Sequence, residues 1–301
     1  MSAHATPLAR PTVTADPPAR SLWGDAADHL RRDRLTVAAV GMVAAFVALA
    51  LAADAISGAL GVSATAVDLA HRFQPPSGAH WLGTDEFGRD ELARVLGGAR
   101  VSLGVATSAA LVTIVLGVSL GASAAMYGGF VDDAFTWLVN TMRAIPSVFL
   151  LLIIAALFHV GPLGLALIIG LTSWMAPARL VRGQALELKA REFVTSARAV
   201  GARDRRIILR HIAPNLVPII SVLIGIDVGQ AILRESALSY LGLGIQPPDA
   251  SWGNMLTNAQ SYFSRGPWLV VAPGLAITVV VWCLYAIGDG VRDAVDPRVV
   301  R

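Results

Sequence analysis

The sequence predicts an all-α integral membrane protein with six membrane-spanning helices. Hydrophobic residues make up 55% of the 301-residue chain and charged residues only 15%, whereas soluble domains contain roughly 25% charged residues. Several apolar runs reach the ~20 residues that a helix needs to cross a bilayer. A turn signal divides the longest run into two, which brings the number of expected spans to six.

The N-terminal region is polar and rich in alanine, proline and threonine, so we expect residues 1–34 to form a disordered tail. Three arginines at the end of this tail lie directly before the first apolar run, 35–53. This run is too long for the core of a signal peptide and predicts a retained helix. The positive-inside rule then places the tail in the cytoplasm. Residues 35–301 are expected to form one six-helix domain.

The remaining spans are predicted from later parts of the chain. Gly161 and Pro162 form a turn signal in the middle of the longest apolar run, so we expect a third span that begins near Pro146 and a fourth that follows the turn. The further apolar runs, of which one is interrupted by a single aspartate, are 101–131, 144–178, 211–233 and 266–288.

Alternation of the spans assigns a side of the membrane to each loop. It places the polar insert 54–100 outside, and the segment 181–212 and both termini in the cytoplasm. Between residues 181 and 210 the chain carries eight arginine and lysine residues against three acidic residues, a net charge of +5. Because cytoplasmic loops are enriched in positive charge, this count agrees with the topology.

The segment between the fourth and fifth spans is predicted to form two short helices. Residues 190–200 contain no glycine or proline, and Gly201 follows where a helix commonly ends in left-handed geometry. Asp204 is expected to cap the second helix, and Pro214 suits the first turn of the next span. From physics alone, such a basic surface element could touch anionic lipid or seat in a partner's groove.

Several residues of this segment resemble a known motif. Glu192, the pair Ser196-Ala197, Gly201 and the triplet Ala213-Pro214-Asn215 resemble the EAA loop of ABC importer membrane subunits. In that family the loop forms the coupling helix, which inserts into a cleft of the cytoplasmic ATPase. The sequence departs from the motif by Ser196 in place of an alanine, Arg203 in place of a serine and Ala213 in place of a leucine. The resemblance assigns ATPase coupling to Glu192, Phe193, Ser196, Ala197, Ala199, Gly201 and Pro214.

Three further stretches resemble the permeases of dipeptide and oligopeptide importers. They are HWLGTDEFGRDELARVLGGARVSLG (80–104), ESALSYLGLGIQPPDASWGNML (235–256) and GDGVRDAVDPR (288–298). Together they favour the "C" permease of such a system over its "B" partner, and the resemblance runs from about residue 30 to the end. It implies the type I ABC importer permease fold in the bacterial plasma membrane.

The resemblance also implies partners and cargo. A second homologous permease would complete a heterodimer, two cytoplasmic ATPases would bind ATP and Mg²⁺, and an extracytoplasmic binding protein would deliver the substrate. Membrane lipid surrounds the spans, and no cofactor is expected in this chain. Di- or oligopeptides are the expected cargo, with nickel complexes, glutathione and short saccharides as the alternatives within the same importer class.

Missing motifs agree with a subunit that is not an enzyme. The only lysine is Lys189, so no GxxxxGK[ST] phosphate loop exists, and HExxH and GxSxG are also missing. The single cysteine, Cys283, argues against a metal cluster and is expected to pack in a span. Because the arginines lie in blocks beside the spans, a nucleic-acid surface is not expected. The rival classes are an ion-coupled secondary transporter and a membrane scaffold.

Asp227 lies near the middle of the fifth span, with Gln230 and Arg234 three and seven positions on. A charge at the centre of a helix in lipid costs roughly 2.5–3.5 kcal/mol, so it should face protein or water. One hypothesis is that these three residues line the translocation path. The alternative is that Asp227 bonds to a helix of the partner permease, and in an ion-coupled transporter it would be the ion site.

The external stretches carry local expectations. Thr84 is expected to cap a helix over 84–97, in which the pairs Asp85/Arg89 and Asp90/Arg94 share a face. Trp252 and Trp268 are expected to anchor the chain at the membrane interface. Gly117 and Gly121 have the spacing that lets two helices approach closely.

Overall fold

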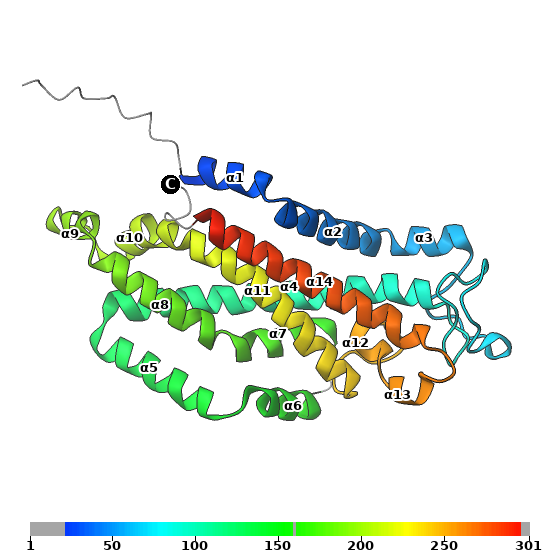
Figure 1. Ribbon diagram of the computed structural model, residues 1–301. Coiled ribbons are helices and arrows are strands. Elements are labelled where there is room, and N and C mark those ends of the chain that lie inside the picture. Colours follow the sequence, from blue (N-terminus) through cyan, green and yellow to red (C-terminus); the bar gives the residue numbers. More distant parts are fainter. Residues whose placement is uncertain (1–21, 159–160, 296–301) are drawn as a thin grey trace, which may run out of the picture.

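The computed structural model describes residues 22–158 and 161–295, which form helices joined by loops (Figure 1). Two of the elements are single turns of other types, the 3₁₀ turn η1 and the π-helical turn η2. In chain order the elements are α1 (Leu22–Arg32), α2 (Arg34–Leu51), α3 (Ala53–Leu60), η1 (Leu69–His71), α4 (Glu91–Tyr127), α5 (Gly129–Ala144), α6 (Ser147–Leu157), α7 (Pro162–Ser173), α8 (Met175–Lys189), α9 (Glu192–Ala199), α10 (Asp204–Ile207), η2 (Ile208–Ile212), α11 (Ala213–Tyr240), α12 (Trp252–Met255), α13 (Ala259–Tyr262) and α14 (Trp268–Val295).

Four of the described helices are individually long and apolar enough to cross a membrane. They are α2, α4, the continuous element from α10 to α11, and α14. Two bent pairs can each form a further span, with angles of 80° between α5 and α6 and 46° between α7 and α8. With each bent pair counted as one span, the predicted set of six is confirmed.

The third span differs from the prediction that it begins near Pro146. α6 has 11 residues, about 16 Å of helix, which is too short to cross a bilayer alone. α5 supplies the rest, and Ile145 adopts an extended conformation at the bend, because a following proline disfavours helical geometry. The next turn agrees with prediction, since Pro162 begins α7; residues 159 and 160 lie outside the described residues.

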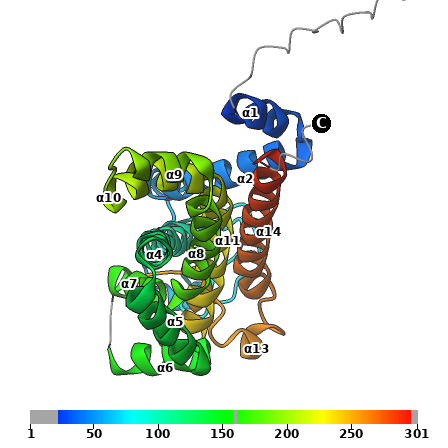
Figure 2. The same ribbon diagram turned by 90° about the vertical axis from the view of Figure 1, so that its left-hand side faces the viewer.

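α4 runs along the middle of the bundle and contacts α7, α8 and α11, and α14 packs against α11 and α2. Seen along the bundle, α5 and α6 lie at one flank and α1 and α2 at the other (Figure 2). α1 contacts α14 and α2, so the tail expected to be disordered to residue 34 is helical from residue 22. The carboxylate of Asp33 explains the junction, because it accepts hydrogen bonds from the first backbone N–H groups of α2. Residues 1–21 lie outside the described residues.

Small residues bring α4 and α8 together, as their spacing predicted. A Cβ added at Gly117 would lie 3.0 Å from the Cβ of Pro177, and one at Gly121 would overlap the carbonyl oxygen of Ala178. The two backbones are therefore in direct contact along one turn of each helix. Cys283 is buried in α14 and packs as expected.

The segment before α4 folds differently from the prediction. Thr84 caps no helix; its hydroxyl donates to His71 O and accepts from Gln74 N. The helix begins at Glu91, with Asp90 as its N-cap. Residues 84–90 instead form a tight turn held by backbone bonds to the preceding loop, so the two expected charge pairs do not share a helix face.

The two tryptophans also differ from the expected interfacial anchors. Trp252 is fully buried, and its indole N–H donates to Val95 O. Trp268 is partly buried, and its indole N–H donates to Thr84 O. Each indole therefore ties the connection between α11 and α14 to the segment around the start of α4. Long-range hydrogen bonds of this kind leave no pattern in the local sequence.

The contact between α4 and α8 makes a testable prediction. Gly121→Ala should lower the melting temperature of the purified protein in detergent, because the added Cβ meets backbone that cannot rotate away. Gly104→Ala, in the same helix, is the matched control, since nothing lies within 4 Å of a Cβ there. It should leave the melting temperature unchanged or raise it through better helix propensity. Equal effects of the two substitutions would contradict the close approach.

Candidate functional site

α9 lies at one end of the bundle, opposite the long loop that precedes α4 (Figure 1). Val194 is its one buried residue and packs in a core cluster with Ile207, Ile212 and Leu216. This cluster also includes residues of α4 and α8, such as Met126 and Val181. The helix is therefore attached to three long elements mainly through Val194, with Ala197 packed beside it, and most of its other residues are exposed.

The glycine turn after α9 has the geometry that the sequence predicted. Gly201 has φ of 84°, its N–H donates to Arg198 O at 2.9 Å, and the N–H of Ala202 donates to Ala197 O at 3.0 Å. These two bonds form a Schellman motif, which ends a helix with a left-handed residue. Nothing lies within 4 Å of a Cβ added at Gly201, so backbone conformation and not space requires the glycine.

The predicted coupling residues lie on α9 and its glycine turn, except Pro214, which lies at the start of α11. Glu192, Ser196 and Ala199 are exposed, and Ala197 is partly buried against the core cluster. Phe193 is half-exposed, with its ring 6.2 Å from that of His211. The sequence reasoning missed Val200, whose side chain is 86% exposed beside the turn.

The prediction that Asp204 caps the second short helix is wrong, whereas the prediction that Pro214 lies in the first turn of the next span is confirmed. Asp204 is the first residue of α10 and makes no capping bond; its carboxylate accepts from Arg198 Nη2 at 3.3 Å. Pro214 lies in the first turn of α11, and α10, η2 and α11 together form one continuous element. Arg203, directly before this element, and three arginines within it line a shallow hollow with the exposed Leu209: Arg205, Arg206 and Arg210.

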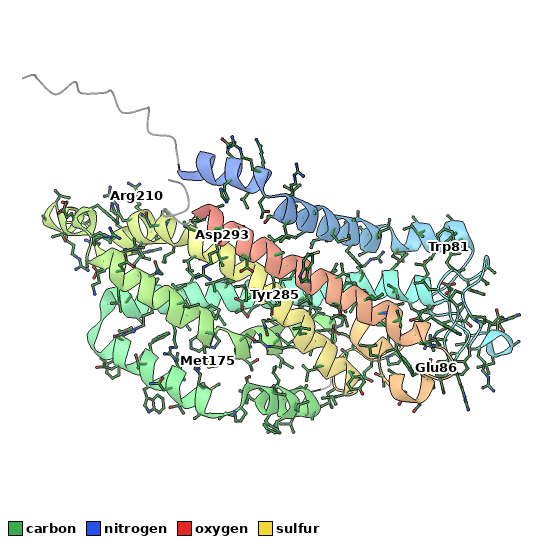
Figure 3. All side chains as sticks on the ribbon, viewed as in Figure 1. Trp81, Glu86, Met175, Arg210, Tyr285 and Asp293 are labelled. Atoms are coloured by element: carbon green, nitrogen blue, oxygen red, sulfur yellow. The ribbon has the colours of Figure 1, made fainter. Side chains whose placement is uncertain are left out.

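Two residues of the predicted translocation path form hydrogen bonds to other helices. The amide of Gln230 donates to the hydroxyl of Tyr285 in α14, and Arg234 Nη1 donates to Ser173 Oγ in α7 at 2.8 Å. Asp227 Oδ2 is buried and has no partner among the described residues. Tyr285 lies at mid-length of the bundle (Figure 3). Gln230 and Arg234 therefore bind two different helices, whereas Asp227 interacts with the charge of Arg234 and leaves one carboxylate oxygen without a hydrogen bond.

A fully buried carboxylate that the sequence reasoning missed joins three elements. Glu235 in α11 accepts from Ser102 Oγ in α4 at 3.0 Å and from Ser239 Oγ at 2.7 Å. Ser102 Oγ in turn accepts from the backbone N–H of Trp252 in α12 at 3.1 Å. The carboxylate is thus satisfied entirely by hydroxyl groups. The sequence does show Ser236 and Ser239 one and four residues after Glu235. This spacing indicates a buried hydroxyl cluster only when Ser102 is known to lie nearby.

A second group of charged side chains lies in the segment before α4 and in the first turn of that helix. Asp85 accepts from Arg89 Nε at 2.6 Å and lies 3.4 Å from Arg94 Nε. Asp90 Oδ2 lies 2.8 Å from His80 Nδ1. Burial raises the pKa of the neighbouring Glu86 carboxyl above its ordinary value, because desolvation disfavours the charged form. These side chains are buried or partly buried, whereas the sequence predicted a solvated helix.

Residues 113–301 match the family model of the binding-protein-dependent transport system inner membrane component. The chain is 35% identical to a dipeptide transport system permease protein of Alkalihalophilus pseudofirmus, over 98% of each chain. It is 32% identical to an oligopeptide transport system permease protein of Bacillus subtilis, over 92% of this chain and 90% of the relative.

A solved structure shares the fold. A chain of the MetNI methionine ABC transporter, in an inward-facing conformation, superposes with a TM-score of 0.53 at 20% identity. The match covers 67% of this chain and 96% of that one. At this level of identity the likeness supports the arrangement of the helices alone.

The buried carboxylate makes a testable prediction. Glu235→Ala should strongly destabilise the protein, because it leaves the buried hydroxyl groups of Ser102 and Ser239 without their acceptor, at a cost of about 1–3 kcal/mol for each unsatisfied group. We expect a lower melting temperature and less folded protein in the membrane. Glu187→Ala removes a carboxylate whose pair with Arg191 is exposed, and such pairs contribute roughly 0–1 kcal/mol. A Glu235 variant as stable as this control would mean that the hydroxyl cluster does not hold the three elements.

Proposed function

The chain belongs to the family of binding-protein-dependent transport system inner membrane components, and we propose that it carries di- or oligopeptides across the bacterial membrane. As a member it is the permease component of a binding-protein-dependent ABC importer. The observation that supports peptide cargo is the identity of 35% and 32% to permeases named for dipeptide and oligopeptide transport, over more than nine-tenths of this chain. Nickel complexes, glutathione and short saccharides are the alternative cargoes.

We infer that the α9 end faces the cytoplasm and that one of two ATPase subunits docks there. The basic segment around α9 and the C-terminal end of α14 lie at this end (Figure 1), in agreement with the positive-inside rule. The ATPases bind ATP and Mg²⁺, so catalysis takes place outside this chain. A second, homologous permease completes a heterodimer, and an extracytoplasmic binding protein delivers the peptide at the opposite end.

The packing suggests how force would reach the spans. Val194 fixes α9 to a cluster that contains residues of α4, α8 and α11. α8 is in backbone contact with α4 through Gly121, so the two helices move together. Closure of the ATPases would displace α9 as a lever, and these contacts would pass the motion to the bundle. The spans would then change from inward-open to outward-open.

The proposal is tested by uptake. Cells that lack this chain should accumulate less labelled di- and oligopeptide than cells in which it is restored, in a strain without a redundant importer. Uptake that is abolished by depleting ATP, and not by collapsing ion gradients, excludes an ion-coupled transporter. If peptides enter equally in both strains, the cargo is wrong. The family membership would remain, and the ligand held by the partner binding protein would identify the substrate.

Gly201→Val should uncouple ATP hydrolysis from transport. A β-branched residue tolerates positive φ poorly, so the Schellman turn would distort and shift α9 against the ATPase. We expect ATPase activity of the reconstituted importer to persist while uptake falls, at a normal membrane level of the protein. Gly183→Val is the matched control, because Gly183 is an exposed helical residue with free space around it. Normal coupling in the Gly201 variant would refute the role of the turn.

Asp227→Asn should reduce uptake of peptides with cationic side chains more than uptake of neutral peptides. The Asp227 carboxylate has an oxygen free of hydrogen bonds that a passing cation could contact, and the substitution by an amide removes its negative charge. Competition between lysine-containing and alanine-containing dipeptides in the uptake assay measures the effect. Asp293→Asn, an exposed change at the α9 end (Figure 3), is the control. An unaltered preference would favour the alternative that Asp227 bonds to the partner permease.

A further inference from the structure

α5 and α6, the bent pair that forms the third span, lie together at one flank of the bundle (Figure 2). Phe135 and Val139 are the buried residues of α5, and they pack in a cluster with Ala124 of α4 and Met175 of α8. The two are four residues apart, so they lie on one face of the helix, and this face attaches α5 to the bundle. Most other residues of α5 are exposed in this chain.

The exposed surface of α5 has an apolar side and a polar side. Ala134 and Leu138 are exposed and four residues apart. Thr136, Asn140 and Arg143 are also exposed and recur at intervals of four and three residues, so they share one face. We call these three residues the α5 stripe. Leu138 lies two residues from both Thr136 and Asn140, about 200° around the helix, so the apolar side points away from the stripe.

The α5 stripe reaches deep into the span. α5 begins at Gly129, at the end of the bundle that carries α9 (Figure 1). Arg143 lies about 21 Å further along the helix, at 1.5 Å per residue, and the hydrocarbon core of a bilayer is only about 30 Å thick. Beyond Arg143 the bend and α6 continue the span. A charged side chain at such a depth is costly in lipid, so it must face protein or water.

The side chains of the stripe have no partner in the part of the chain that the structure describes. Neither the Asn140 amide nor the Arg143 guanidinium forms a hydrogen bond or ion pair within residues 22–158 and 161–295. The Thr136 hydroxyl is also unbonded there, although a hydroxyl can bond to its own helix, as three hydroxyls of other spans do: Ser119, Ser221 and Thr278. Lipid offers such groups no partner. A covering protein surface would bury a guanidinium group, which is strongly disfavoured without a matching carboxylate, whereas water satisfies all three groups.

We propose that the α5 stripe lines a water-filled path through the membrane, along which polar substrates pass. The path follows the exposed flank of this chain, so the second permease forms its opposite wall. Arg143 presents a positive charge and five N–H donors, and it is the group of the stripe that binds a carboxylate of the passing substrate. Thr136 and Asn140 can each donate and accept hydrogen bonds. The inference rests on the permease role in the proposed function, and it holds for any polar cargo.

The accessibility of introduced cysteines to water tests the proposal. Cys283, the only cysteine of the chain, is first replaced by alanine, and Thr136→Cys, Asn140→Cys or Leu138→Cys is then added. The complete importer, with both permeases and the ATPases, is placed in nanodiscs so that a reagent reaches both faces of the membrane. The probe is a methanethiosulfonate that carries a trimethylammonium group. Mass spectrometry follows the rate of its addition to this chain, and gel filtration checks that each complex assembles.

Thr136→Cys and Asn140→Cys should react at least about tenfold faster than Leu138→Cys, because the reagent is charged and attacks the thiolate, and neither charged species enters lipid. Leu138→Cys is the matched control, since it lies at the same depth on the apolar side. Equal rates at the three positions would mean that α5 has one environment on all sides, and would overturn the proposal. Slower reaction at the stripe than at the control would show that protein covers the stripe, with the same consequence.

A pair of exchanges tests the same assignment without cysteines. Arg143→Leu should leave the amount of folded protein in the membrane unchanged, because Arg143 forms no hydrogen bond or ion pair within the described part of the chain. Leu138→Arg should lower that amount severalfold, since it moves a charge to the side that faces lipid. A rise in folded protein with Arg143→Leu, or equal tolerance of arginine at both positions, would contradict the proposal.

The labelling result and the proposed cargo can fail separately. Uptake of labelled di- and oligopeptides by the complete importer, with its binding protein present, tests the cargo. Fast labelling of the stripe without peptide uptake would leave the path standing and refute peptide import. Peptide uptake with equal labelling of the three positions would leave peptide import standing and refute the path.

Discussion

Contact between the backbones of α4 and α8 is the constraint on which the arrangement of the other spans depends. In a bilayer there is no hydrophobic force to bring helices together, so association relies on close packing and on polar contacts between helices. Gly117 and Gly121 remove the side chains that would hold the axes apart. α4 can then contact α8, α7 and α11 at once, and α14 adds to this group through α11. The bundle is built outward from one long helix.

The two ends of the bundle are held by different kinds of interaction. At the α9 end, one buried valine and a two-bond turn hold a short helix whose surface is otherwise open. At the other end, the hydroxyl cluster around Glu235 and the ion pairs around Asp85 fasten the loops to α4 and α11. The short helix at one end is therefore held by few contacts, whereas the loops at the other end are held by many polar contacts.

Polar groups within the spans are used in two ways. Gln230 and Arg234 bind side chains of α14 and α7 and so join helices. Asp227 keeps a buried oxygen without a partner among the described residues. The energetic cost of an unpaired group in a span is only sustained if something completes it, such as a second permease, water or the cargo. Polar residues that bond to other helices of this chain therefore stabilise the fold, whereas a residue with an unbonded oxygen can still bind another molecule.

The sequence by itself determined the class of fold, the six spans, the basic segment and the glycine turn, because these depend on composition and on bonds between near neighbours. Pro162 and Gly201 set their turns through φ alone, and the spans follow from run length. The sequence did not determine that Pro146 bends a span, that Trp252 is buried, or that the charges at 85–94 form a compact turn. Those outcomes depend on which distant residues meet: Ser102 with Glu235, Thr84 with Trp268, and Gly121 with Ala178. Only the tertiary structure decides such contacts, since each joins residues more than 50 positions apart, a separation at which local patterns carry no information.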